Sequence, residues 1–262
     1  MEDAIQTFLA SAAAVAVLML VTWLVSVAMR DASIVDIAWG AGFVVVAWTA
    51  FAFNGETDAR NWVVVALVSV WGLRLSGYLA WRNLGKGEDY RYQAMRRYWG
   101  SRFPIVSLFT VFGLQGVLML VVSLPVQMVQ IPGGPDGLMW LDYAGIVAWG
   151  AGFFFESVGD WQLARFKADP ANAGKVMDRG LWRYTRHPNY FGDFLAWWGL
   201  FLLALARPEL AWTVIGPIVM SILLIRVSGV ALLERSIGKR RPGYEEYVRR
   251  TSAFVPMPPK KP

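Results

Sequence analysis

One short stretch, RYTRHPNYFGD (183–193), gathers side chains whose types and spacing could do chemistry. It contains the only histidine of the sequence, two arginines, two tyrosines, an asparagine and an aspartate. Guanidinium groups bind phosphate oxygens through paired hydrogen bonds, and aromatic faces stack on flat ligand rings. Because a run of apolar residues follows directly, the stretch predicts a binding site for a phosphorylated, ring-containing ligand where a polar loop meets an apolar segment.

Two cation-rich loops extend this pattern. The loop 81–100 alternates arginine, lysine and tyrosine around one acidic pair, and the loop 165–193 carries six cations. For any one of these cations, contact with anionic lipid headgroups is the simpler interpretation. Headgroup binding does not account for a fixed proline and an amide among the cations of the second loop. A specific ligand is therefore the better interpretation there.

Ionisable residues also interrupt the apolar segments. A charge inside a membrane-spanning segment costs about 3 kcal/mol, so such residues usually face a cavity or a partner. The residues concerned are Asp36, Arg74 with Tyr78 one helical turn later, Glu156 with Asp160 one turn later, Arg226 and Glu234. They predict a polar cavity that opens toward the cytoplasm. Interhelical pairing or snorkelling is the alternative, chiefly for Arg226.

The elements that must position these residues are membrane-spanning helices. The chain of 262 residues is 56% apolar and only 17% charged, whereas a soluble domain carries about 25% charged residues. A spanning helix needs about 20 mostly apolar residues. Seven stretches qualify or nearly qualify, at about 5–29, 33–53, 62–81, 104–124, 140–160, 191–206 and 210–233. We therefore expect an all-α, polytopic integral membrane protein with about seven transmembrane helices in one membrane-embedded domain, 1–262.

The distribution of lysine and arginine predicts the orientation. With the N-terminus outside, 21 of the 25 basic residues fall in inner segments, whereas the outer loops contain only Arg60 and Arg207. Cytoplasmic loops collect Lys and Arg, so we expect a periplasmic N-terminus, a cytoplasmic C-terminus and an active site facing the cytoplasm of a bacterial inner membrane. Arg207, on the outer face, is expected to play no part in the site.

Composition also excludes several classes of function. The absence of cysteine excludes disulfides and thiolate metal sites, and one histidine excludes a histidine cluster, so we expect no metal. The net charge of +6 follows from the inner loops, and no nucleic-acid partner is expected. The segments GAGFVV (40–45) and GAGFFF (150–155) lack the third glycine of a dinucleotide loop. They are interpreted as glycines that let helices approach closely.

A resemblance to a known family rests on these residues. The segment GLWRYTRHPNYFGDFLAWWG (180–199) resembles the signature of the membrane-embedded steroid 5α-reductase family and its bacterial relatives. Upstream, Asp160, Lys167 and Lys175 stand at the spacing of an acid and two arginines in the reductases. The resemblance covers about 145–258 and includes a closing segment in which a tyrosine lies nine residues before a proline, here Tyr247 and Pro256.

The resemblance implies a set of site residues. The cofactor would be NADPH, and the predicted cofactor-binding residues are Arg74, Asp160, Arg165, Lys167, Lys175, Arg183, Tyr184, His187, Asn189, Tyr190, Asp193 and Glu234. Asp36, Tyr78 and Glu88 are the predicted catalytic residues, with Tyr90 and Tyr92 as further candidates for the acid. The catalytic tyrosine of the family would fall at Trp71, which has no phenolic proton, so either Tyr78, Tyr90 or Tyr92 takes its place or the substrate needs a different acid.

By this resemblance the protein is expected to be an NADPH-dependent reductase. It would transfer hydride to a carbon–carbon double bond of a lipophilic enone, steroid-like or another lipid, that enters from the bilayer among membrane lipids. The C-terminal half is also similar to isoprenylcysteine carboxyl methyltransferases, whose Arg-His-Pro-x-Tyr element matches 186–190. An S-adenosylmethionine-dependent membrane methyltransferase is therefore the alternative. A non-enzymatic transporter or lipid-binding protein is the third interpretation, although no internal repeat supports it.

Overall fold

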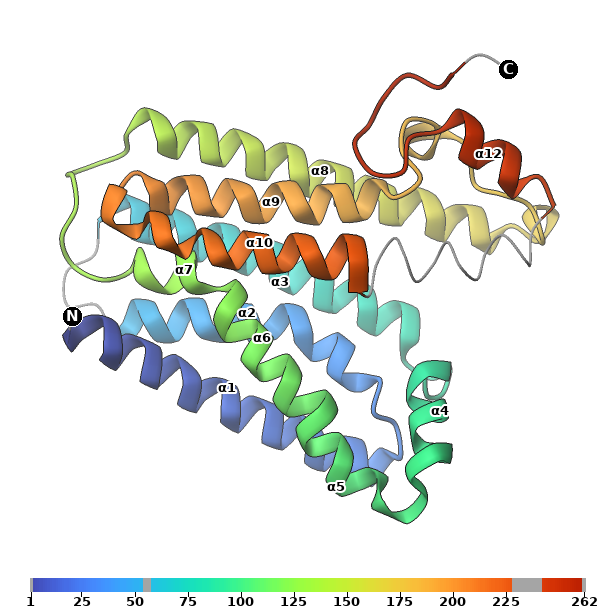
Figure 1. Cartoon of the computed structure of the whole chain (residues 1–262), viewed down its shortest axis with the longest axis horizontal. Coiled ribbons are helices and arrows are strands. Elements are labelled where there is room, and N and C mark those ends of the chain that lie inside the picture. The colour runs from blue at the N-terminus through green and yellow to red at the C-terminus, as the bar shows by residue number, and fades with distance from the viewer. Residues whose placement is uncertain (1, 54–57, 228–241, 261–262) are drawn as a thin grey trace. The chain divides into compact units, whose positions relative to one another are not determined.

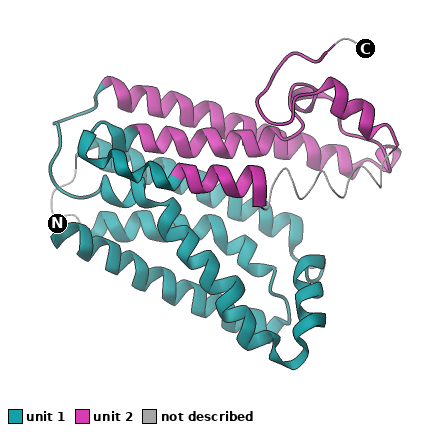
Figure 2. Cartoon of the chain, viewed as in Figure 1, with its two compact units in different colours: residues 1–139, 203–216 teal, residues 140–202, 217–262 magenta. Residues whose placement is uncertain are grey.

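The computed structural model describes residues 2–53, 58–227 and 242–260, and within them the chain is built from helices without a β-strand (Figure 1). The all-α class expected from the sequence is thereby confirmed. Contacts divide the chain into two compact units: unit 1 comprises residues 1–139 and 203–216, and unit 2 comprises residues 140–202 and 217–262 (Figure 2).

Unit 1 contains helices α1 to α7. Their bounds are α1 Glu2–Met29, α2 Ile34–Ala52, α3 Ala59–Asn83, α4 Tyr90–Trp99, α5 Phe103–Ser107, α6 Leu114–Val122 and α7 Leu124–Met128. A π-helical stretch, Leu108–Gly113, joins α5 to α6. The apolar segment expected at 104–124 is therefore an irregular helical run, and the loop expected at 81–100 contains the short helix α4.

Glycines and a cap fix the first helices of unit 1. A Cβ atom on Gly40 would lie 2.4 Å from the carbonyl oxygen of Gly72, so α2 and α3 touch backbone to backbone. A Cβ on Gly42 would lie 2.4 Å from the sulfur of Met119 on α6. The packing role predicted for the glycines at 40–42 is confirmed. The Asp58 carboxylate accepts from the amide of Asn61 at 3.0 Å, which caps the first turn of α3.

Unit 2 is built on two long helices, α8 Trp140–Ala168 and α9 Pro188–Leu205, the second of which ends in unit 1. A Cβ on Gly152 would lie 2.5 Å from the carbonyl oxygen of Gly192, and a Cβ on Gly192 would lie 2.3 Å from the amide nitrogen of Glu156. The two helices therefore pack at the closest approach that glycine permits. The packing role predicted for the glycines at 150–155 is confirmed at Gly152, whereas a Cβ on Gly150 would meet nothing within 4 Å.

The remaining elements of unit 2 lie between and after these helices. They are the 3₁₀ turns Pro170–Asn172 and Gly180–Arg183, most of α10 Ile215–Ile222, the π-helical stretch Leu223–Val227 and α12 Tyr244–Arg250. Thr185 and Ser252 form an isolated parallel bridge. Phe254 packs edge-on against Phe191 and Phe194 of α9, with ring centroids 5.9 and 5.4 Å apart. The C-terminal segment is thus fastened to the start of α9.

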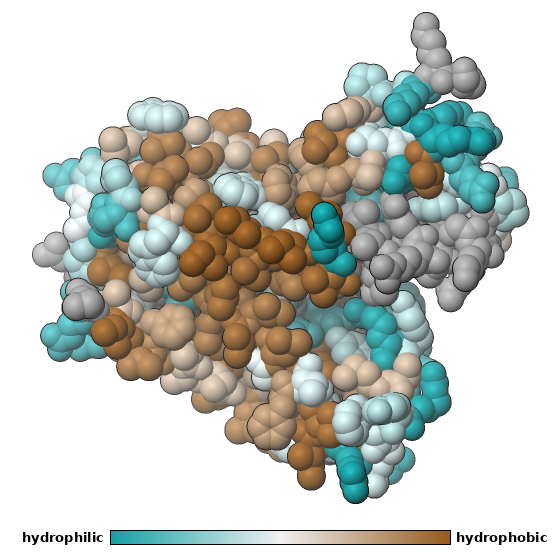
Figure 3. All heavy atoms as spheres, in the orientation of Figure 1, coloured by the Kyte–Doolittle hydropathy of each residue, from teal (hydrophilic) through white to brown (hydrophobic). Residues whose placement is uncertain are grey.

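Among the described residues, five helical runs are long and apolar enough to cross a membrane. They are Glu2–Met29, Ile34–Ala52, Ala59–Asn83, Tyr90–Val122 and Pro208–Val227. Large apolar side chains such as Val17 and Phe109 are 63% and 69% exposed, and in Figure 3 hydrophilic residues gather around α4 and α12. These long apolar helices with exposed apolar side chains are those of an integral membrane protein. The count of seven spans stays a prediction, because α8 and α9, which carry buried acids, are not among the five runs. The orientation also stays a prediction.

Candidate functional site

Unit 1 holds the three residues predicted to be catalytic, and ion pairs enclose two of them. The carboxylate of Glu88 accepts hydrogen bonds from Nη2 and Nε of Arg96 at 2.7 and 2.9 Å, and from the amide of Ala32 at 2.9 Å. The Glu88 side chain is only 8% exposed. Since Ala32 precedes α2 and Arg96 lies on α4, Glu88 ties the start of α2 to α4.

These contacts lower the pKa of Glu88. Burial acts to raise this pKa, but the hydrogen bonds from Arg96 and Ala32 and the charge of Arg96 outweigh the burial. The pKa of Asp89 is lowered in the same way, with burial opposed by hydrogen bonds from Arg91. A carboxyl group that is held ionised has no proton to donate at neutral pH, so this geometry favours a positioning role for Glu88.

Asp36 has two partners of its own on α4. Nη2 of Arg91 lies 2.8 Å from one carboxylate oxygen, and the hydroxyl of Tyr92 donates to the other at 2.7 Å. Nε of Arg91 also donates to Asp89 at 2.8 Å. Asp36 therefore joins α2 to α4, as Glu88 does. Tyr92, one of the candidates for the acid, has its proton directed at Asp36.

The remaining predicted residues of unit 1 lie on α3. Arg74 and Tyr78 are both half-buried and one helical turn apart. The guanidinium of Arg82 lies 5.5 Å from the centroid of the Tyr78 ring, a cation–π contact. Trp71, where the resemblance would place a catalytic tyrosine, is 1% exposed and packs edge-on against Phe43 at 5.6 Å. Trp71 is a core residue of unit 1.

In unit 2, the predicted residues of the signature meet where α8 and α9 touch. Nδ2 of Asn189 donates to Oδ1 of Asp160 at 3.0 Å. A Cβ on Gly159 would lie 3.1 Å from the amide nitrogen of Asn189, so the start of α9 rests directly on α8. Pro188 opens α9 at a position where its missing N–H costs nothing. Asp160 and Asn189 are therefore placed together by backbone packing, as the resemblance implied.

The amide oxygen of Asn189 is the notable atom of this pair. It is buried and has no hydrogen-bond partner within residues 2–53, 58–227 and 242–260. A buried acceptor that lacks a donor costs about 1–3 kcal/mol. The amide nitrogen donates to Asp160, and the oxygen can accept a further hydrogen bond.

Further polar residues surround the pair. Glu156, Asp160 and Asp193 are all buried, the first two on α8 and the third one turn after Asn189 on α9. His187 is 3% exposed, and its ring stacks on that of Tyr190 with centroids 5.6 Å apart and planes 5° apart. Of the predicted residues of the signature, His187 and Asp193 are thus buried, Asn189 and Tyr190 are half-buried, and Tyr184 is exposed.

The predicted cations of unit 2 are not gathered around this pair. Arg165, Lys167, Lys175 and Arg183 are exposed, and the guanidinium of Arg165 lies over the ring of Trp161 at 5.6 Å. Arg183 lines a separate pocket beside the turn Gly180–Arg183. Glu234 lies outside the described residues.

The residues that hold the signature loop in place were not predicted from the sequence. Nη1 of Arg186 donates to the carbonyls of Thr251 and Val248 at 2.6 and 3.1 Å, and its own amide donates to Ser252 at 2.9 Å. The hydroxyl of Tyr247 donates to the carbonyl of Trp182. Arg186 was grouped with the phosphate-binding cations, but its side chain is buried on the C-terminal segment. The tyrosine nine residues before Pro256 was the available signal, since the family resemblance had already marked it.

Comparisons with known proteins agree with this picture at the level of the family. The family model of DUF1295, a family of proteins of unknown function, matches residues 22–251. The chain belongs to the DUF1295 family. The DUF1295 family is related to steroid 5α-reductase-like membrane proteins, so the resemblance read from the signature is supported at that level.

A similar protein occurs in a eukaryote. An uncharacterized protein of the fission yeast Schizosaccharomyces pombe is 22% identical over 267 aligned positions, which cover 90% of this chain and 76% of the yeast protein. No solved structure shows a significant match to the chain. The activity of this DUF1295 protein must therefore be argued from its own site.

Proposed function

We propose that this DUF1295 protein is an NADPH-dependent reductase that reduces a carbon–carbon double bond of a lipophilic enone. The observation that carries the proposal is the Asp160–Asn189 pair, which presents a buried amide oxygen to a ligand that can donate a hydrogen bond. The carboxamide of a nicotinamide ring is such a donor. The relation of the family to steroid 5α-reductase-like proteins supports this choice of cofactor.

The residues of unit 2 fit NADPH in chemistry. Asn189 and Asp160 would hold the nicotinamide end, and the exposed cations at the end of α8 and in the loop after it, among them Lys167 and Lys175, would bind its phosphates. When bound, NADPH supplies the hydride that adds to the electron-poor carbon of the double bond, and a proton completes the reduction. The substrate would be a lipid that reaches the protein from the bilayer.

The residues of the chain itself would position the cofactor and shield it from water. Asp160 fixes the amide of Asn189, and Gly159 and Pro188 hold the start of α9 against α8. A hydrogen bond made to Asn189 in this buried setting is stronger than one made in water. His187 and Tyr190, stacked on each other, form a flat aromatic pair beside Asn189 in sequence.

The experiment that tests the proposal compares two cofactors on the full-length protein in detergent. NADPH is expected to raise the thermal unfolding midpoint, because a ligand that binds the folded state stabilises it. Asn189→Ala should remove this shift, whereas Asn172→Ala, on another asparagine of unit 2 whose amide is satisfied by the carbonyl of Phe166 at 3.1 Å, should keep it. Consumption of NADPH in the presence of a panel of lipophilic enones then measures the reaction.

A methyltransferase that uses S-adenosylmethionine is the second candidate. The stack of the buried His187 on the half-buried Tyr190 favours it, because these residues belong to the Arg-His-Pro-x-Tyr element that resembles the methyltransferases. The Asn189 oxygen would also accept a hydrogen bond from an ammonium group. Stabilisation by S-adenosylhomocysteine with no response to NADPH would replace the reductase with this activity.

A further inference from the structure

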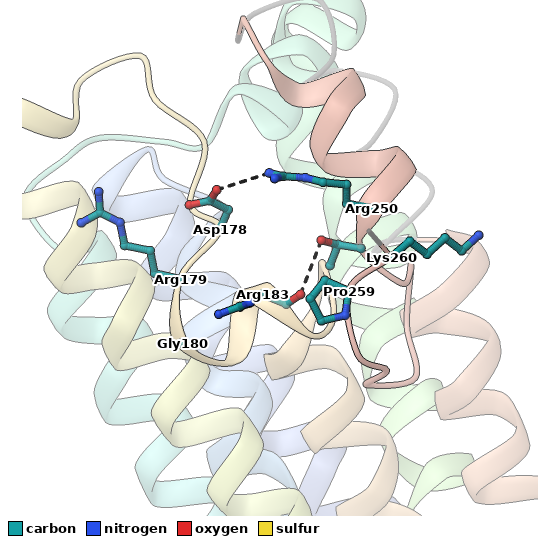
Figure 4. Close-up of a pocket in the computed structure, with 8 residues that line it drawn as sticks. Asp178, Arg179, Gly180, Arg183, Arg250, Pro259 and Lys260 are labelled. Atoms are coloured by element: carbon teal, nitrogen blue, oxygen red, sulfur yellow. Dashed lines mark hydrogen bonds and ion pairs between the residues drawn. The ribbon is translucent and has the colours of Figure 1, made fainter. Parts of the chain in front are cut away.

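A pocket of about 520 Å³ lies in unit 2 (Figure 4). Its lining residues do not include Asp160 or Asn189. Three segments distant in the sequence line it: the loop after α8, the end of α12 and the C-terminal tail. The polar lining residues are Asp178, Arg179, Arg183, Arg250, Thr251 and Lys260. Small-molecule sites range from about 300 to 1,000 Å³, so the volume suits a ligand rather than a water molecule.

The walls of this pocket are fixed by main-chain hydrogen bonds. The amide of Lys260 donates to the carbonyl of Arg250 at 2.9 Å, and the amide of Met257 donates to the carbonyl of Tyr184 at 2.9 Å. The hydroxyl of Thr251 lies 3.5 Å from the carbonyl of Arg183. The tail is therefore held against the turn and the end of α12, which makes the pocket a built feature of unit 2.

The turn Gly180–Arg183 presents one face to α8 and another to the pocket. On one face the amide of Leu181 donates to Gln162 at 3.0 Å and the indole of Trp182 donates to the carbonyl of Gly159 at 3.0 Å, so this face covers α8. The other face, with Gly180 and Arg183, lines the pocket. Neither Asp160 nor Asn189 lines the pocket, and Arg183 is its only lining residue among those predicted to bind the cofactor.

Charge in this pocket is strongly unbalanced. Four of its lining residues are cations and one is an acid. Asp178 lies 3.7 Å from Arg250, and Glu246 on α12 lies 3.6 Å from Arg250. Charge-assisted hydrogen bonds measure about 2.7–2.9 Å, so both carboxylates hold Arg250 loosely. In Figure 4 Arg250 points across the pocket toward Asp178, whereas Arg179 and Lys260 extend away from it on either side.

We propose that this pocket binds the phosphate group of a phosphorylated small molecule. Arginine and lysine around a hollow raise the local concentration of anions, and the guanidinium of Arg250 would exchange its loose carboxylate partner for a phosphate oxygen. The volume leaves room for an organic part beside the phosphate. Two sources share this chemistry: a soluble phosphate ester and the headgroup of an anionic lipid. The proposal does not depend on the reductase activity.

The test titrates the full-length protein in an uncharged detergent by calorimetry, at constant ionic strength. The two probes are inorganic phosphate and a short-chain phosphatidic acid, with short-chain phosphatidylcholine as the lipid without net charge. Arg250→Gln should weaken binding about fivefold or more, the effect of one exposed charge pair. Arg249→Gln, on the neighbouring arginine of α12 that does not line the pocket, is the matched control and should bind as the wild type does.

A second variant is expected to strengthen binding, and such a gain cannot be produced by misfolding. Asp178→Asn removes the carboxylate that competes for Arg250, so it should tighten phosphate binding by a similar factor. Binding of both probes with this pattern supports the proposal with a soluble phosphate ester included among the ligands. Binding of phosphatidic acid alone with the same pattern supports it with a lipid headgroup as the source. Equal effects of Arg250→Gln and Arg249→Gln, or no saturable binding of either probe, would overturn it.

Discussion

The carboxylates of unit 1 and the Asp160–Asn189 pair of unit 2 were predicted for one site, yet their surroundings differ. In unit 1, Glu88 has three donors and Asp36 has two, all from within the same unit. In unit 2, Asn189 keeps a buried acceptor oxygen without a partner in the described part of the chain. A polar group that is already satisfied stabilises the fold, whereas a buried group that lacks a partner requires another explanation, such as an ordered water or a bound ligand.

This difference separates two uses of charge in an apolar protein. The ion pairs Glu88–Arg96 and Asp36–Arg91 add polar contacts between α4 and the start of α2. The Asp160–Asn189 contact also joins two helices, but it satisfies only half of the Asn189 amide. The two acids of unit 1 therefore have protein donors for their charge, whereas the oxygen of Asn189 has none in the described part of the chain.

The largest effect is expected at Arg186. Its side chain is buried and donates to the carbonyls of Thr251 and Val248. Arg186→Ala would leave these acceptors without donors and should lower the free energy of unfolding by roughly 3 kcal/mol. Chemical unfolding in detergent measures this loss. Arg183→Ala, on an exposed arginine of the same loop, should cost less than about 0.5 kcal/mol; equal losses would mean that the loop is not held by Arg186.

The next effect concerns ligand affinity. Asn189→Ala and Asp160→Asn should each weaken NADPH binding by at least about tenfold, which corresponds to about 1.4 kcal/mol. The first variant removes the unpartnered oxygen, and the second loosens the amide that carries it. Equilibrium dialysis with NADPH measures both. Wild-type affinity in both variants would show that the contrast between the two units says nothing about ligands.

Part of this structure could be predicted from the sequence. The apolar blocks predicted where helices lie, because burial in lipid or protein requires long apolar runs. The irregular run at 104–124 could not be predicted, since a π-helical stretch has no hydrophobic period of its own. The pairing of Asp160 with Asn189 was implied by the resemblance alone. Their spacing in the sequence carries no such information.

Arg207 shows why the rest could not be predicted. It was expected to play no part in the site, which stays a prediction, but its structural role was not foreseen: Arg207 is 8% exposed and donates to the carbonyl of Ile131 at 2.6 Å and to Glu209 at 2.9 Å. A single charged letter in a loop does not reveal whether its side chain reaches solvent or the carbonyls of another loop. Arg207 is therefore unsuited as a silent control for binding experiments.

A smaller effect is expected at Glu88. Glu88→Gln keeps the shape of the side chain but removes the charge that pairs with Arg96, and it should lower the free energy of unfolding by about 1 kcal/mol. Arg96→Gln should cost a similar amount, and the double variant should cost less than the sum of the two because the pair is already broken. Loss of turnover in Glu88→Gln, with folding and NADPH binding intact, would instead restore Glu88 as the acid and break the comparison.

The smallest effect is the dependence of this ion pair on pH. The pKa of Glu88 in the folded state lies below its ordinary value of 4.5. The stability that ionised Glu88 contributes is therefore fully present above pH 4.5 and is lost as the pH falls through the lower folded-state pKa. The difference in unfolding free energy between wild type and Glu88→Gln should shrink as the pH falls below that value. Asp89, whose pKa is also lowered, is retained in both proteins, so its titration cancels in the difference. A difference that stays constant down to low pH would show that the Arg96 contact does not depend on the charge of Glu88.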